Sequence, residues 1–325
     1  MATVGVVASL VFAVIAIRGV EFGLFWRGLK EMQYVWVGPS LVALAVTVAL
    51  RIYRWQLLFT RESRPPFGSA TRALLIGSML NQILPLRAGE AARVVVLNQD
   101  AGISRVEALG TVVVERVYDV LVLFILLFVA WPVLPPVSWI HGAAIFAVIF
   151  VAGLAAAVAV LVRFGSRPLR FVLAPVAAFP GLTRARMDAA AESLTAGLRG
   201  MHHPKLLMAA FAVSVISWLT AGLSYWAILV GFHLHLSFAA AVLVLVATNL
   251  ALVIPSLPAG LGVFEAAAIL ALGAYGLTES QALACAVVLH AVNLFPYIAV
   301  GLGALHRHAL LRRRRLRARG STAPD

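Results

Sequence analysis

Residues 236–265 read LSFAAAVLVLVATNLALVIPSLPAGLGVFE, and this stretch decides the class of fold. Its first part, 236–254, is apolar and free of charged residues. It is close to the ~20 residues that a helix needs to cross ~30 Å of hydrocarbon. An elbow rich in proline and glycine follows at once, with Pro255, Pro258, Gly260 and Gly262. The pattern predicts a membrane helix that runs into a broken segment.

The composition of the whole chain agrees with that reading. Of 325 residues, 62% are hydrophobic and 12% are charged, whereas a soluble domain is about 45–50% apolar and about 25% charged. A soluble enzyme, a secreted disulfide scaffold and a disordered chain are therefore excluded. The only cysteine, Cys285, allows neither an intrachain disulfide nor a cysteine metal cluster. No metal site or other cofactor is expected.

We predict one all-α, polytopic membrane domain over 1–325, a helical bundle of about eight membrane segments. The expected full spans are 1–17, 34–50, 106–131, 139–162, 206–230, 236–254 and 282–305. Two interrupted segments lie at 73–97 and 257–275.

Basic residues orient the chain. The formal net charge is +13, and most Lys and Arg residues fall in alternate connections, in a central linker at 163–205 and in a tail at 306–325. By the positive-inside rule both termini face the cytoplasm, as in a multi-pass protein of the cytoplasmic (inner) membrane. Part of the linker is expected to form an amphipathic cytosolic helix. Anionic lipid headgroups, rather than nucleic acid, are the expected partners of this charge, and a homo-oligomer is left open.

Two parts of the chain, 70–131 and 236–305, resemble each other. A shift of 174 residues places Arg116 over His290 and Asp119 over Asn293, and a shift of 173 places a Pro-x-x-x-Gly elbow over the other. Since the two spans that follow the elbows run in opposite directions, the repeat would be inverted. Inverted repeats with broken segments mark the binding site in many transporters. The alternative is coincidence in a sequence of few residue types.

The first elbow carries polar residues that a membrane helix does not need. A break here implies a cavity lined by protein or water, although an interfacial loop with charges reaching toward water is the alternative. The residues predicted to form the elbow or to bind a substrate are Asn81, Pro85, Arg87, Gly89, Glu90 and Arg93.

Three ionisable residues, Glu115, Arg116 and Asp119, lie inside the span at 106–131. Such residues are costly in a membrane, and they usually face the bundle interior in pairs. They are interpreted either as an internal ion-pair cluster or as a headgroup site in which Arg116 meets a phosphate. One cluster could serve both purposes.

The second elbow is followed by Glu265 and preceded by Asn249, and His290 and Asn293 lie on the last span. These four residues complete the predicted substrate-binding set. Two structural alternatives remain: Glu265 caps the helix that it begins, and His290 is a satisfied core residue.

The two elbows and the Glu115-Arg116-x-x-Asp119 motif resemble the signatures of the lysylphosphatidylglycerol synthase transmembrane, flippase-like family, over nearly the whole chain. In the multiple peptide resistance factors of that family, such a bundle flips an aminoacylated phospholipid that a separate C-terminal domain synthesises. The resemblance implies a stand-alone bundle without the synthase domain, and Ala259 is a mild departure where glycine is common. Other relatives are linked to hopanoid transport or to lipid-linked sugars, so the substrate does not carry over.

The expected function is a lipid flippase or transporter, not an enzyme, that moves a lipid with a polar, phosphate-bearing headgroup. One alternative is an integral-membrane transferase acting on a polyprenyl-phosphate substrate, with Glu90 as a base. The other is a scaffold without transport activity in an envelope complex.

Overall fold

The computed structural model describes residues 11, 12, 14, 19–84, 88–164, 204–252 and 258–320. Over these ranges the chain is helical and forms no strand, as expected of an all-α bundle. Most of the expected first span and most of the central linker lie outside the described residues. Pro85, Arg87 and Pro255 lie outside them as well.

Ten α-helices and three short 3-10 helices make up the described part of the chain. They are α2 (Phe22–Glu31), η1 (Tyr34–Trp36), α3 (Val37–Leu57), α4 (Phe67–Ile83), α5 (Gly89–Ala101), α6 (Arg105–Ala130), η3 (Trp131–Val133), α7 (Ser138–Phe164), α10 (Pro204–Gly231), α11 (Phe238–Ala251), η5 (Pro258–Gly260), α12 (Val263–Gly273) and α13 (Glu279–Gly320).

Three stretches of the described residues are helical, long and apolar enough to cross a membrane: Tyr34–Leu57, Lys205–Gly231 and Glu279–Arg313. Helix α6 has 26 residues but carries three charged side chains, Glu115, Arg116 and Asp119, near its middle, and it is not among these three stretches. Shorter apolar stretches are Ser138–Gly153 within α7, Phe238–Ala251 and Pro258–Gly273. These findings support a membrane protein, and the number of about eight segments stays a prediction.

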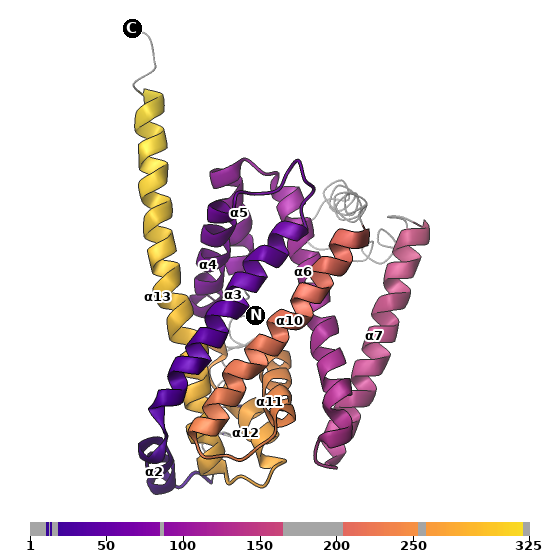
Figure 1. Ribbon diagram of the computed structural model, residues 1–325, viewed down its shortest axis with the longest axis vertical. Coiled ribbons are helices and arrows are strands. Elements are labelled where there is room, and N and C mark those ends of the chain that lie inside the picture. Colours follow the sequence, from indigo (N-terminus) through magenta and orange to yellow (C-terminus); the bar gives the residue numbers. More distant parts are fainter. Residues whose placement is uncertain are drawn as a thin grey trace.

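Helices α3 and α10 cross the middle of the molecule side by side, while α6 and α7 form a pair at one edge (Figure 1). Small hydroxyl residues join α3 to α10. The Ser40 hydroxyl donates to the Ser224 carbonyl at 2.8 Å, and the Thr47 and Thr220 hydroxyls lie 2.9 Å apart. Small polar residues let membrane helices approach closely and bond across the contact.

The first elbow joins α4 and α5, which pack against each other. Leu84, the residue before Pro85, has φ −102° and ψ 145°. A residue before proline is pushed out of the helical region by the proline ring. This explains why α4 ends at Ile83 although the chain remains apolar.

The hairpin of α4 and α5 closes through two glycines. A Cβ atom at Gly77 would lie 2.8 Å from the Gly89 carbonyl oxygen, and a Cβ at Gly89 would overlap the Gly77 carbonyl oxygen and lie 2.7 Å from the Asn81 nitrogen. Only glycine permits two backbones to come this close. Gly89 is therefore a contact point between helices, in addition to being part of the elbow.

The second elbow lies between α11 and α12, which also pack together. Its described part contains η5, in which Ala259 and Gly260 have positive φ of 62° and 75°, and Gly262, which precedes α12 with φ 82°. For alanine this conformation costs roughly 1–2 kcal/mol, whereas glycine adopts it freely. Helix α4, which precedes the first elbow in the sequence, contacts η5 of the second elbow.

Helix α13 is longer than the sequence suggested. A span at 282–305 with a separate basic tail was expected, but α13 runs without interruption from Glu279 to Gly320 and extends beyond the rest of the bundle (Figure 1). Arginine, leucine and alanine are strong helix formers, so the basic sequence continues the helix.

Two groups of buried apolar side chains flank the middle of the molecule. One includes Ile76 of α4 and Leu97 of α5, and the other includes Leu245 of α11 and Leu272 of α12. Each hairpin thus has its own core, and the functional cavity lies where the two hairpins face each other.

Candidate functional site

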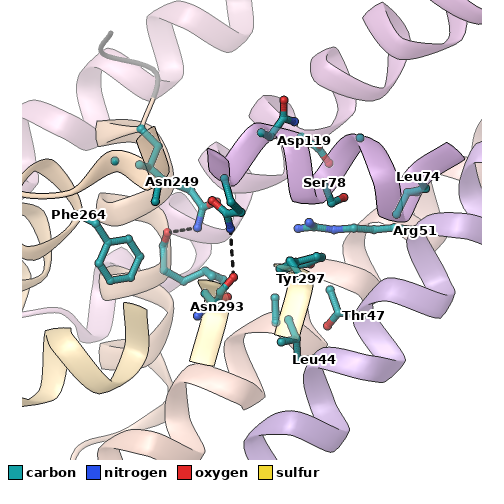
Figure 2. A pocket seen from close by; sticks show the side chains of 18 of the residues that line it. Leu44, Thr47, Arg51, Leu74, Ser78, Asp119, Asn249, Phe264, Asn293 and Tyr297 are labelled. Atoms are coloured by element: carbon teal, nitrogen blue, oxygen red, sulfur yellow. Dashed lines mark hydrogen bonds between the residues drawn. The ribbon is translucent and has the colours of Figure 1, made fainter. Parts of the chain in front are cut away.

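A cavity of about 420 Å³ lies between the two hairpins. Residues from α3, α4, α5, α6, α10, α11, η5, α12 and α13 line it, so both parts of the proposed repeat contribute. Figure 2 shows the side chain of Arg51 extending from α3 with its guanidinium directed into this space, near Ser78 and Tyr297. The wall has a charged side and an amide side.

Arg54, at the end of α3, is at the centre of the charged side and is fully buried. Its Nη1 donates to Asp119 Oδ1 at 2.6 Å and to Ser214 Oγ at 3.0 Å, and its Nη2 lies 2.9 Å from Glu115 Oε1. The Trp218 indole nitrogen also donates to Asp119 Oδ1, at 3.0 Å. Arg54 therefore holds α3, α6 and α10 together through charge.

Glu115 forms ion pairs with three arginines. Besides Arg54, it accepts both Nη groups of Arg93, from α5, and the Arg116 Nη2 at 3.2 Å. The Arg93 guanidinium stacks over the Trp55 ring, with its central carbon 4.4 Å from the centroid. Buried carboxylates persist in low dielectric only when they are paired in this way, so Glu115 is held as a fixed negative centre.

Arg116 is the most accessible member of the cluster, with 38% of its side chain exposed. It lies 3.3 Å from Glu90 Oε1 through Nε, and 3.5 Å from Asp119 Oδ2 through Nη2. The structure thus shows the internal ion-pair arrangement that the sequence left open. Its exposed part also lines the cavity.

Arg51 differs from the other arginines. Its guanidinium lies over the Trp218 ring at 4.9 Å, and its buried Nε has no hydrogen-bond partner among the described residues. The ion pairs found in the described part of the chain do not include Arg51. This arginine is charged and directed into the cavity, and it forms no salt bridge with a carboxylate of the described residues, although it interacts electrostatically with Asp119.

The charges of the cluster do not cancel. Four arginines, Arg51, Arg54, Arg93 and Arg116, face three carboxylates, those of Glu90, Glu115 and Asp119. The described residues therefore leave an excess of one positive charge beside the cavity. In a low-dielectric interior such an excess favours an anionic group.

The amide side of the wall comes from four residues on three helices. Gln82 of α4 donates to the Asn293 backbone carbonyl at 3.1 Å, which ties the end of α4 to α13. Asn249 and Asn293 each donate to a carbonyl of their own helix, and the buried Oδ1 of Asn81 has no partner among the described residues. Buried polar atoms without partners usually meet water or a ligand, so Asn81 and Arg51 both indicate a polar occupant.

Glu265 and His290 form a second, smaller unit at the edge of the cavity. Glu265 Oε2 accepts the Gly262 backbone N–H at 2.7 Å, so this carboxylate caps α12, as one interpretation of the sequence predicted. Its other oxygen lies 2.5 Å from His290 Nδ1. His290 Nε2 lies 3.1 Å from the Ala259 carbonyl. His290 lines the cavity, while Glu265 contacts it only through His290.

The structure brings most of the predicted site residues together. Glu90 pairs with Arg116 rather than lining the wall, and Arg87 lies outside the described residues. The predicted residues that line the cavity are Asn81, Arg93, Glu115, Arg116, Asp119, Asn249, Gly260, His290 and Asn293. Among the described residues, no three His, Cys, Asp or Glu side chains gather in a way that could hold a metal ion.

Arg51 and Arg54 were missed because the second span was predicted to end at residue 50, which made both arginines cytoplasmic loop residues. The structure continues α3 to Leu57. A usable signal was present, because Arg51, Arg54 and Trp55 follow an apolar helix at spacings of three and four residues without a proline or glycine. Trp218 and Tyr225, on α10, had no distinguishing signal.

A protein-family model described as lysylphosphatidylglycerol synthase TM region matches residues 2–301 of the chain. Among curated proteins and among solved structures, nothing matches. The match covers all three motifs that carried the resemblance.

Proposed function

The chain belongs to the lysylphosphatidylglycerol synthase TM region family, and from this premise we propose that it moves a lipid with a polar headgroup across the cytoplasmic membrane. The family match itself supports a membrane protein of lipid metabolism or transport. The observation that carries the finer proposal is the cavity between the two hairpins, because it combines amide groups with an arginine that forms no salt bridge within the described part of the chain.

The arrangement of elements supports a transporter. A long helix, a short helix, an elbow, a second short helix and another long helix occur in the order α3–α6 and again in the order α10–α13. We take this as an inverted repeat with re-entrant hairpins, in which the substrate site lies where the repeats meet. The pairs Arg116 with His290 and Asp119 with Asn293, which the sequence shift superposes, all line the same cavity.

The charge of the cavity favours a phosphate-bearing headgroup. A guanidinium binds phosphate oxygens through planar, charge-assisted hydrogen bonds. In this proposal Arg51 binds the phosphate, the amides of Asn81, Asn249 and Asn293 bind the other polar groups, and the acyl chains stay in the bilayer. Both termini face the cytoplasm, where the basic end of α13 meets anionic lipid.

A lipid bound in this way should co-purify with the protein. We expect mass spectrometry of lipid extracted from purified Arg51→Gln protein to show about tenfold less bound phospholipid than from wild type. A hydrogen bond to a charged group contributes about 1.5–3 kcal/mol, and each 1.4 kcal/mol corresponds to about a factor of ten. Glutamine is shorter than arginine and uncharged, but its amide can still donate a hydrogen bond to neighbours.

The matched control is Arg61→Gln, which removes one exposed arginine from a connection outside the cavity. It should retain the wild-type amount of lipid. Equal lipid content in the Arg51→Gln and wild-type proteins would count against a headgroup site at Arg51. Such a result would favour a scaffold, whereas a chemically altered lipid would favour a transferase.

A further inference from the structure

His290 lies between two hydrogen-bond acceptors. Its Nε2 lies 3.1 Å from the Ala259 backbone carbonyl oxygen, and its Nδ1 lies 2.5 Å from Glu265 Oε1. A backbone carbonyl can only accept, so Nε2 must carry a hydrogen. This contact fixes the tautomer of the ring and leaves Nδ1 for the carboxylate.

The second contact requires one more proton. A neutral histidine with its hydrogen on Nε2 presents a lone pair at Nδ1, and an ionised carboxylate presents only lone pairs. Two lone pairs repel each other at 2.5 Å, so a proton must lie between Nδ1 and Oε1. Whether that proton is assigned to the imidazole or to the carboxyl group, the pair holds one proton more than neutral His290 and ionised Glu265 together.

The other contacts of these two side chains are already occupied. Glu265 Oε2 is occupied by the Gly262 N–H at 2.7 Å, and the Phe264 ring stacks on the His290 ring with centroids 4.5 Å apart. Helix α2 packs against the first turns of α13, where Gly28 lies next to Ala284. Groups that face the cavity from the helices around the pair are Arg51 of α3, the amides Asn81 and Gln82 of α4, Tyr225 of α10, Asn249 of α11, Tyr297 of α13, and the charged cluster of Arg93, Glu115, Arg116 and Asp119 on α5 and α6.

We propose that His290 and Glu265 form a proton-binding site that holds the second elbow against α13. When the proton leaves for water in the cavity, which His290 lines, neutral His290 can keep only one of its two contacts. If its hydrogen moves to Nδ1 to satisfy Glu265, Nε2 turns a lone pair toward the Ala259 carbonyl and that bond is lost. If the hydrogen stays on Nε2, the contact with Glu265 of α12 is lost instead. Either way, proton loss breaks one of the two contacts through which His290 of α13 holds η5 and α12.

Once a contact is lost, η5 is expected to change its backbone conformation. Ala259 has φ 62°, a conformation that is unfavourable for alanine and that the bond from His290 helps to maintain. Helix α4 contacts η5, so movement of η5 would reach α4, which carries Asn81 and Gln82 to the cavity. If the chain is a lipid transporter, the proton would be its coupling ion, and this last step alone rests on the proposed function.

A spin label on the elbow tests the site without any cargo. In a Cys285→Ala background, Leu261→Cys provides a half-exposed attachment point between η5 and α12, and Leu270→Cys on α12 provides a control of similar exposure. The label spectrum is recorded in lipid vesicles from about pH 5 to about pH 8, a range that brackets the pKa of an unperturbed imidazole. We expect the elbow label to become freer as the pH rises, with its free-to-restricted ratio changing about tenfold per pH unit, as one linked proton requires. The Leu270→Cys label should not change.

Glu265→Gln is the decisive variant. Its amide oxygen can accept from Gly262 and its amide nitrogen can donate to Nδ1, so neutral His290 keeps every contact without the extra proton. The elbow label should then stay restricted over the whole pH range. His290→Gln, which has no titratable ring, should also give a flat curve and serves if Glu265→Gln does not fold.

The proton site would be overturned if the spectrum of the wild-type elbow label did not change with pH. It would also be overturned if the label in the Glu265→Gln protein changed with pH as it does in wild type. Lipid scrambling measured in the same vesicles separates this result from the proposed function. Vesicles that never scramble lipid would count against transport alone, because the label spectrum requires no cargo.

Discussion

Replacing Arg54 by methionine is expected to leave little folded protein. The fully buried guanidinium contacts Asp119 at 2.6 Å and Glu115 at 2.9 Å, and methionine fills similar space without charge. Removing one partner of a buried ion pair costs about 3–5 kcal/mol, a large share of the about 5–15 kcal/mol that stabilises a typical protein. We expect a sharp fall in the fraction of monodisperse protein after detergent extraction and a clearly lower melting temperature.

Arg61→Met removes an exposed arginine and should change the melting temperature little. The double variant Arg54→Met/Asp119→Asn should recover part of the loss, because it removes one of the carboxylates that Arg54 neutralises. An Arg54→Met protein as stable as Arg61→Met would show that Arg54 does not hold the cluster together.

A second large effect is expected at Gly89. In Gly89→Ala the new methyl group would overlap the Gly77 carbonyl oxygen and lie 2.7 Å from the Asn81 nitrogen. Both obstacles are backbone atoms, which cannot rotate away as a side chain does. Overpacking of this kind costs about 1–3 kcal/mol or more. Because the hairpin carries Arg93 and Asn81 to the cavity, lipid co-purification should be lost together with thermal stability.

Gly303→Ala is the matched control, since a Cβ atom there meets nothing within 4 Å. In a helix this change should be neutral or stabilise the protein by about 0.5–1 kcal/mol. If Gly89→Ala melts and binds lipid like Gly303→Ala, the close approach of α4 and α5 is not required.

The sequence predicted which helices and elbows form better than it predicted where each helix begins and ends. Leu84 leaves the helical region, as expected of a residue before proline, and the described part of the second elbow contains positive φ angles at Ala259, Gly260 and Gly262. The length of α13 could not be foreseen from hydropathy, because a helix that leaves the membrane needs no apolar residues. The described residues contain three stretches that meet the criteria for a simple span, since charge interrupts α6 and the elbows shorten others.

The site was only partly foreseeable, for a physical reason. Polar residues within apolar runs, such as Glu115 and Asn249, stand out in a sequence because the membrane makes them costly. Arg54 does not stand out, because an arginine at the end of an apolar run has the same pattern as an ordinary loop residue. Only packing against α6 and α10 makes it buried. Likewise, the proposed proton between His290 and Glu265 rests on distances that no spacing in the sequence reveals.

The most direct test of lipid movement through this cavity is a scrambling assay in proteoliposomes. A phospholipid with a fluorophore on its acyl chain is incorporated into both leaflets, and a reductant that does not cross membranes bleaches the outer one. Wild type and Arg61→Gln should expose nearly all of the fluorophore to bleaching, whereas equally folded Arg51→Gln should do so about tenfold more slowly. Wild-type vesicles that bleach no further than protein-free vesicles, or an Arg51→Gln protein that scrambles at the wild-type rate, would contradict the account.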